Sequence, residues 1–269
     1  GVSEPESKSA PPGKHAEAAS KPLIMIPVTA EDVQRQKRRR LLKWLAGLLI
    51  ALLVAAIIYK RVTDPRNARE AFDAGMRLMK TTRYDQAILN FNRAVDLVPD
   101  YTEAYRMRGR AYVEQSDPAM AIRDFSRVSE LQPRDATILA ERGFVHLDQK
   151  DYAAAIADAD RALALDPKLA RAYNLRAGAR RATGDLRRAI EDFTQAIALE
   201  PNLDNYFQRA STYQKLGEHK LAVADFDQAL AEDPQEPHIY YARAQSRAAL
   251  GDNAGAQADL LAGRKIDGF

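Results

Sequence analysis

The sequence predicts an all-α protein in which a single N-terminal transmembrane helix precedes a solenoid of helical repeats. The chain is apolar over residues 41–59 (LLKWLAGLLIALLVAAIIY), apart from Lys43, and from residue 68 onward it repeats with a period of 33 or 34 residues. The chain has no cysteine, so packing must stabilise the fold without disulfides, and thiol chemistry is excluded.

The charge is spread unevenly along the chain. The formal net charge is +3, but residues 62–269 hold 29 Lys and Arg against 32 Asp and Glu, a net charge of −3. The basic excess therefore lies in and beside the apolar run, where it is explained by membrane topology and by attraction to anionic lipid. We expect no nucleic-acid partner.

Residues 1–28 are expected to form a disordered or extended tail. Residues 1–21 are rich in Pro, Ser, Ala, Glu and Lys and cannot bury enough apolar surface to fold alone. Residues 22–28 (PLIMIPV) are apolar, and their two prolines oppose a helix. This segment is either a linker that lies against the membrane or a peptide that docks on a partner. The candidate docking residues are Leu23, Ile24, Met25 and Ile26.

A helix is expected over residues 29–61, with the membrane span at 41–59. Thr29 is a capping residue, and Glu31 and Asp32 suit the positive end of the helix dipole. Nineteen residues form about 28 Å of helix, close to the ~30 Å hydrocarbon core of a bilayer. A buried core helix would show a polar face, and a cleaved signal peptide would show small residues at a cleavage site. Neither is present, which favours an uncleaved anchor.

Basic residues on the two flanks of the span predict its orientation. Arg35, Lys37 and residues 38–40 (RRR) precede it, whereas only Lys60 and Arg61 follow closely. The richer flank stays in the cytoplasm, so the residues after Lys60 are translocated. We expect a bacterial inner-membrane protein with periplasmic repeats. A short linker, residues 62–67, contains the helix-start signal Asp-Pro and keeps the next domain near the membrane.

The repeat is defined by small residues and proline at fixed places. An alanine recurs at intervals of 34, 34, 34, 33 and 34 residues, and a proline follows twelve residues after each of the first five. Small residues let two helices cross closely, and proline ends a helix. The repeated alanines are Ala87, Ala121, Ala155, Ala189, Ala222 and Ala256.

This pattern resembles the tetratricopeptide repeat family over residues 68–269. Six units are expected, at 68–101, 102–135, 136–169, 170–202, 203–236 and 237–269. The resemblance implies that each unit is a helix–turn–helix, that the units stack into a right-handed superhelix, and that the concave face binds a peptide or protein. Aromatic residues of the repeat are expected in the core, among them Phe91, Phe125, Phe193 and Phe226.

An arginine and an aspartate recur together sixteen residues apart, and both are missing from the first unit, which has Ala74 and Asn90. Their joint loss predicts structural ion pairs between the two helices of each hairpin, so we exclude these arginines from a binding site. The expected pairs are Arg108–Asp124, Arg142–Asp158, Arg176–Asp192, Arg209–Asp225 and Arg243–Asp259.

The resemblance assigns the concave face to the second, fifth, ninth and twelfth places of each unit. Arginine can bind carboxylates there, and methionine and aromatic side chains accept varied apolar shapes. An extended, partly acidic peptide would fit; the alternative is that some of these side chains only cover their neighbours. The places hold Arg69, Phe72, Met76, Met79, Arg106, Arg110, Val113, Phe144, Leu147, Arg171, Asn174, Arg181, Phe207, Ser211, Gln214, Tyr241 and Gln245.

The subfamily that clamps the C-terminal carboxylates of chaperones needs Lys and Asn at the fifth and ninth places. The first three units have neither residue at these places, so chaperone docking of that kind is not expected. The four histidines are scattered, and no phosphate loop or catalytic set occurs. We therefore expect no enzyme, cofactor, metal or small-molecule substrate.

The resulting hypothesis is a membrane-anchored scaffold that binds other proteins, themselves membrane-associated, during assembly or organisation of an envelope or membrane complex. A stable accessory subunit of a large membrane complex is the first alternative. A receptor on an organelle outer membrane, with cytosolic repeats, is the second.

Overall fold

The computed structural model describes residues 30–62 and 65–268. These residues form thirteen helices and no strand, which confirms the predicted all-α class. The chain divides into two compact units, residues 1–58 and 59–269. The apolar segment proposed to dock, residues 22–28, lies outside the described residues.

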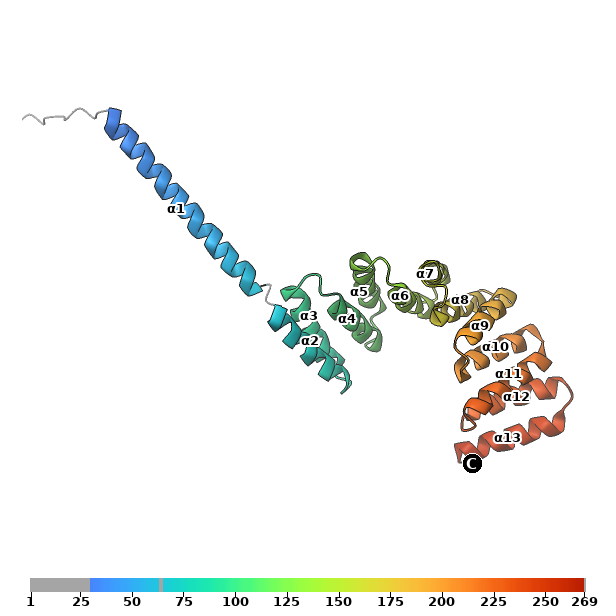
Figure 1. Ribbon diagram of the computed structural model, residues 1–269. Helices are drawn as coiled ribbons and strands as arrows, with labels where there is room; N and C mark the ends of the chain where they lie inside the picture. The colour runs from blue at the N-terminus through green and yellow to red at the C-terminus, as the bar shows by residue number, and fades with distance from the viewer. Residues whose placement is uncertain (1–29, 63–64, 269) are drawn as a thin grey trace, which may run out of the picture. The chain divides into compact units, whose positions relative to one another are not determined.

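Helix α1 (Ala30–Val62), drawn in Figure 1, has 33 residues, which at 1.5 Å per residue make it about 50 Å long. The most apolar stretch of 18 residues within Val33–Tyr59 has a mean hydropathy of 2.6, and none of this stretch is buried. Trp44, for example, is 78 % exposed. By length and composition the helix can cross a membrane, a property that signal sequences share.

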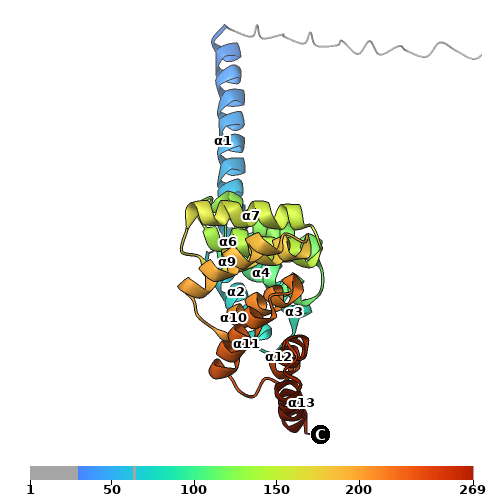
Figure 2. The ribbon, with the colours of Figure 1, turned by 90° about the vertical axis from the view of Figure 1, so that its right-hand side faces the viewer.

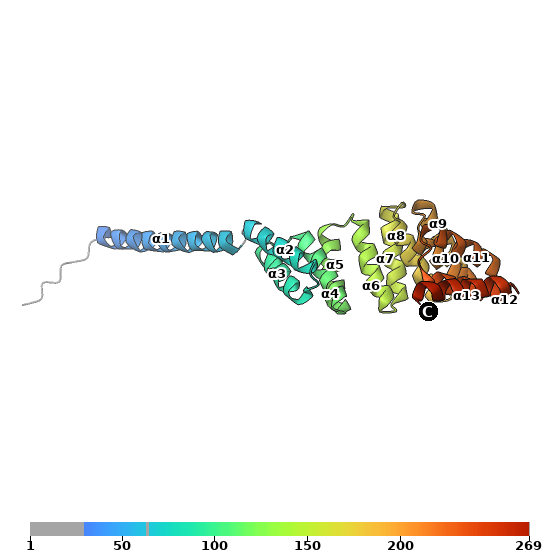
Figure 3. The ribbon, with the colours of Figure 1, turned by 90° about the horizontal axis from the view of Figure 1, so that it is seen from below.

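Residues 65–268 form twelve helices in six antiparallel hairpins, which lie in chain order (Figures 1 and 3). Each first helix packs against the second helix of its own hairpin, and from α4 onward it also packs against that of the hairpin before. Figure 2 shows α7, α9 and α11 turned progressively against one another. The helices are α2 (Pro65–Met79), α3 (Tyr84–Leu97), α4 (Thr102–Glu114), α5 (Pro118–Leu131), α6 (Ala136–Asp148), α7 (Tyr152–Leu165), α8 (Ala170–Ala182), α9 (Leu186–Leu199), α10 (Leu203–Leu216), α11 (His219–Glu232), α12 (Pro237–Ala249) and α13 (Asn253–Asp267).

Aspartate fixes the start of most second helices. The carboxylates of Asp117, Asp151, Asp185 and Asp252 each accept a hydrogen bond from the backbone N–H three residues on. Such a cap satisfies one of the free donors of a helix N-terminus and contributes about 1 kcal/mol. Helix α2 begins at Pro65, before the expected start of the first unit at residue 68, because proline fits the first turn of a helix.

The core lies where the two helices of each hairpin cross. The repeated alanines of the first five hairpins are fully buried. Phe91, Phe125, Phe193 and Phe226 are at most 2 % exposed, as predicted for core aromatics. A Cβ atom on Gly75 would lie 2.5 Å from Cε1 of Phe91, so the first helix needs glycine where it crosses the ring.

The third hairpin solves the same packing problem differently. Ala159 stands where four of the other hairpins have phenylalanine and the sixth has Leu260, and Leu175 of the next hairpin fills the space. Its Cδ2 atom would be 2.3 Å from a Cβ on Gly143. The core is thus continuous across the boundary between hairpins three and four.

Candidate protein-binding groove

The five expected Arg–Asp pairs are all brought together. In each of these five pairs the Nε and Nη2 atoms of the arginine donate to the two carboxylate oxygens of the aspartate, at 2.5–3.0 Å. The aspartate side chains are 1–8 % exposed. This bidentate geometry joins the two helices of a hairpin and leaves these arginines no free fork for a ligand.

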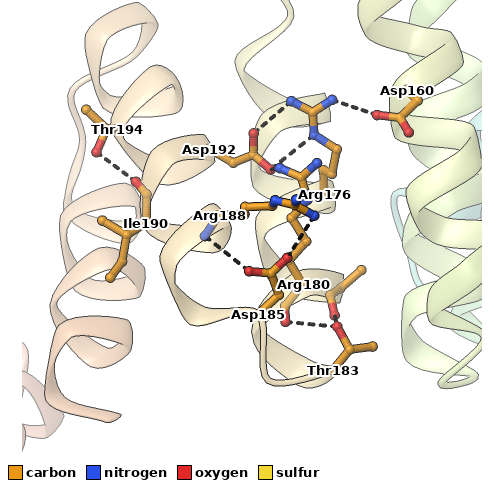
Figure 4. A network of polar contacts seen from close by, with 10 residues as sticks. Asp160, Arg176, Arg180, Thr183, Asp185, Arg188, Ile190, Asp192 and Thr194 are labelled. Atoms are coloured by element: carbon orange, nitrogen blue, oxygen red, sulfur yellow. Dashed lines mark hydrogen bonds and ion pairs between the residues drawn. The ribbon is translucent and has the colours of Figure 1, made fainter. Parts of the chain in front are cut away.

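A third partner of these arginines was missed by the sequence reasoning. Nη1 of each arginine donates to a short polar side chain on the second helix of the preceding hairpin, as Arg176 does to Asp160 at 2.6 Å (Figure 4). One guanidinium thus holds three helices together. The repeated polar character of these places was a usable signal in the sequence. The acceptors are Asn92, Ser126, Asp160, Thr194 and Asp227.

Two of the aspartates bind a second arginine closely, and a third, Asp158, has Arg161 at 3.9 Å. Arg180 donates to Asp192 at 2.7 Å (Figure 4), and Arg247 lies 3.1 Å from Asp259. Asp225 has only Arg209 as a cationic partner among the described residues. The five pairs are therefore not equivalent, although their sequence pattern is the same.

The first helices line one side of the stacked hairpins, which we call the inner side. The first helices of neighbouring hairpins can meet there, as α6 and α8 do. A pocket of about 300 Å³ opens there, with an apolar floor that includes Met79, Val113 and Phe144. These three occupy places that the sequence assigned to the groove. Glu114, Phe125, Glu141, Val145 and Asp148 also line the pocket but were not predicted, and Arg110 and Arg171 complete it.

Two of the predicted groove arginines are held by carboxylates of the next hairpin. Arg110 forks onto Glu141 at 2.9 and 2.6 Å, and this hydrogen bonding raises the pKa of Arg110. Arg106 donates to Asp135 and, at 3.3 Å, to Thr137. Both lie on α4 as expected, but their charges are already neutralised. Glu141 is only 7 % exposed, so a charge reversal at Arg110 would disturb the fold as well as any ligand.

Three further polar candidates also have partners within the chain. Nδ2 of Asn174 donates to Oδ1 of Asn205 at 2.7 Å, which links α8 to α10. Arg69 forms an exposed ion pair with Asp73 one turn on, and the Tyr241 hydroxyl donates to Asp267 at 2.5 Å. The matching residues are Asn205, Asp73 and Asp267, none of which the sequence reasoning had placed.

The predicted aromatic and methionine candidates are half-buried. The Phe72 ring lies 5.2 Å from Tyr101 and 5.8 Å from Phe91, between centroids. Phe207 packs edge-on against His238 at 4.9 Å. Met76 is likewise half-buried on α2. These side chains cover the core while leaving one edge on the groove.

Arg171 and Arg181, both on α8, differ from the other candidates. The exposed Arg171 lies over the ring of Phe144, with Cζ 5.0 Å from the centroid, at the edge of the pocket. The half-buried Arg181 lies 5.6 Å from the centroid of Phe193. Neither forms an ion pair with a carboxylate in the described part of the chain. The positive charge available to a ligand thus lies on α8 and not on α4.

Stacked antiparallel hairpins with a groove along their first helices define a helical repeat scaffold. Tetratricopeptide repeat models match residues 72–125, 106–170, 170–203 and 203–236, which together span more than half of the chain. The chain therefore belongs to the tetratricopeptide repeat family, whose members are protein-interaction scaffolds. Its resemblance to that family in sequence is confirmed.

Solved structures show the same fold at low sequence identity. MamA from Desulfovibrio magneticus RS-1 is 21% identical with a TM-score of 0.57, over 62% of this chain and 96% of that one. PilF of Pseudomonas aeruginosa is 17% identical with a TM-score of 0.63, over 72% and 89%. A tetratricopeptide repeat protein from Parabacteroides merdae is 20% identical with a TM-score of 0.62, over 79% and 83%. No curated protein matches this chain in sequence.

Proposed function

We propose that this chain is a membrane-anchored scaffold that holds a protein partner in its groove while a membrane complex is assembled or organised. The pocket between Met79 and Phe144 is the observation on which this proposal rests. It is large enough for a large apolar side chain, and it lies on the inner side of the hairpins, where successive first helices meet. Segments of a partner that carry such a side chain would be anchored there.

The anchor part of the proposal is supported by α1. Large apolar side chains surround this helix on all sides; Leu41, Trp44, Ile57 and Tyr59 are between 61 % and 78 % exposed. In water such a surface would be strongly unfavourable, whereas in a bilayer it needs no protein partner. The richer basic flank before the span supports an orientation with the N-terminus in the cytoplasm and the hairpins on the other side.

The partner is expected to be membrane-associated, because few residues separate the end of α1 from the start of α2 at Pro65. A partner in the groove would thus be held near the bilayer. Protein capture is the role that this arrangement supports. Among the described residues no group of three or more His, Asp and Glu side chains is placed to hold a metal ion.

Site-specific photocrosslinking in native membranes tests the groove. A photoreactive phenylalanine analogue at Val113, which is 39 % exposed beside the pocket, should give crosslinks to one or a few defined proteins. The matched control is the same analogue at Leu89, which is 66 % exposed on the second helix α3. Equal crosslinking from the two sites, or none from Val113, would count against capture in the groove.

The topology is tested separately. If α1 is an anchor with the predicted orientation, the full-length chain is found in the membrane fraction of untreated cells. Protease added to spheroplasts should then digest the hairpins. Hairpins protected from external protease would contradict the orientation. A mature chain that lacks α1 would show instead that the helix is a signal sequence.

A further inference from the structure

Arg181 carries a positive charge that nothing else in the described chain neutralises. Its Nη1 atom reaches only the backbone carbonyl oxygen of Gln208, at the long distance of 3.5 Å. Its Cζ atom lies 5.6 Å from the centroid of Phe193, a weaker form of compensation. Burial lowers the pKa of Arg181, yet a guanidinium remains protonated at neutral pH. The groove therefore contains a partly desolvated cation without a counter-ion.

The repeat itself indicates that the fold does not need this charge. The twelfth place of the first three units holds Met79, Val113 and Leu147, all apolar, and only the fourth unit has arginine there. Met79 and Val113 line the pocket of the groove, so side chains at this place face the inner side of the hairpins. A partly buried charge without a partner costs stability, and an apolar side chain would avoid that cost.

Two other groove arginines, unlike Arg181, already have a carboxylate partner in the chain. Arg106 and Arg110 pair with Asp135 and Glu141, so a ligand would have to displace a carboxylate of the chain to reach them. Arg181 offers its fork without such competition. An incoming carboxylate would gain a charge-assisted, bidentate contact in a partly desolvated setting, where such contacts are strongest.

We propose that Arg181 is the carboxylate receptor of the groove and binds an acidic group of the captured protein segment. This inference rests on the proposed function, because it names the chemistry that the same groove recognises. The carboxylate is supplied either by an Asp or Glu side chain or by the C-terminus of the segment. The groove thus combines an apolar pocket near α4 and α6 with an anion site at Arg181 on α8.

Selection of short random peptides tests the receptor. The full chain in nanodiscs is used as bait, with Arg181→Met as the variant and Arg187→Met as the control, because Arg187 is exposed on the second helix α9. Peptides selected on the unchanged chain should be enriched in acidic groups and should bind Arg181→Met about tenfold more weakly or worse, the effect of ~1.4 kcal/mol. The Arg187→Met chain should bind them as the unchanged chain does. The selected peptides are then synthesised again with an amidated C-terminus. Loss of binding would show that Arg181 binds the C-terminal carboxylate, and unchanged binding that it binds an Asp or Glu side chain.

Thermal unfolding provides the second readout. Arg181→Met should unfold at the same temperature as the unchanged chain or a higher one, because methionine at this place matches the first unit. A lower temperature would mean that Arg181 is structural and would overturn the proposal. Selected peptides that lack acidic groups, or that bind Arg181→Met equally well, would overturn it while leaving capture in the groove intact. Failure to select any peptide above empty nanodiscs would overturn both.

Discussion

The inequality of the five Arg–Asp pairs leads to a quantitative prediction. Replacing Arg209 by alanine leaves Asp225, 8 % exposed, without any cation among the described residues. Removing one partner of a buried ion pair costs about 3–5 kcal/mol, because the other charge stays buried and uncompensated. Replacing Arg176 removes an equally good fork, but Asp192 keeps Arg180 at 2.7 Å. That change should cost only roughly 1.5–3 kcal/mol, the range for a hydrogen bond to a charged group.

The chain also suggests how the damage can be repaired. Its first unit has Ala74 and Asn90 at the places of the pair, and Nδ2 of Asn90 donates to the carbonyl oxygen of Gln86 at 2.8 Å. Combining Arg209→Ala with Asp225→Asn reproduces this arrangement. The double variant should therefore be more stable than Arg209→Ala by at least about 1 kcal/mol, since no buried charge is left unpaired.

Hydrogen exchange of the full chain in nanodiscs measures these effects locally, which matters because repeat arrays can open in parts. A loss of ~3 kcal/mol should speed exchange in α10 and α11 roughly 100-fold, and Arg176→Ala should affect α8 and α9 less. The reasoning is refuted if Arg176→Ala is as damaging as Arg209→Ala, or if Asp225→Asn worsens the Arg209→Ala variant.

Two further predictions concern packing and pH. Gly143→Ala should lower stability by about 1–3 kcal/mol in thermal unfolding, because its Cβ would meet Leu175 at 2.3 Å; an unchanged melting temperature would contradict the tight crossing. Burial raises the pKa of Asp135, but hydrogen bonds from Thr137 and the pairing with Arg106 more than offset it, so the net pKa lies below the usual 3.8. The stabilisation that Asp135 contributes is therefore complete above the pKa that Asp135 has in the unfolded chain. It is lost as pH falls through the lower pKa that Asp135 has in the folded chain. Circular dichroism should show the unchanged chain more stable than Arg106→Met at neutral pH, with the difference shrinking on acidification below about pH 4; a difference that grows would contradict it.

Local periodicity was enough to predict the hairpins, but not the contacts between first helices. Alanine, glycine and proline recur at fixed spacing, because every hairpin meets the same steric demand at its crossing, as Gly75 and Phe91 show. The Arg–Asp pairs were predictable because their sixteen-residue offset lies within one hairpin. The pairing of Arg110 with Glu141 was not predictable, because Glu141 belongs to the next unit and the contact depends on how neighbouring first helices pack.

The third hairpin shows a second limit. Ala159 interrupts the row of core phenylalanines, and nothing near it in the sequence indicates that Leu175 fills the space. Likewise, sequence pattern placed Arg106, Arg110 and Arg181 in one class of groove residue. Only the structure shows that carboxylates neutralise Arg106 and Arg110 but not Arg181.

The guanidinium contacts between hairpins also determine where such a chain can change its length during evolution. Each arginine lies sixteen residues before its own aspartate in all five pairs, but Arg209 lies fifteen residues after Thr194, where the other four arginines lie sixteen after their acceptors. The missing residue belongs to the connection between α9 and α10, residues 200–202, which is shorter than the connection 166–169 between α7 and α8. A deletion there leaves every fork in register. The same deletion inside a hairpin would rotate one helix by about 100° and separate the pair. A hairpin is thus a unit of fixed length, whereas the junction between two hairpins can differ in length without separating a pair.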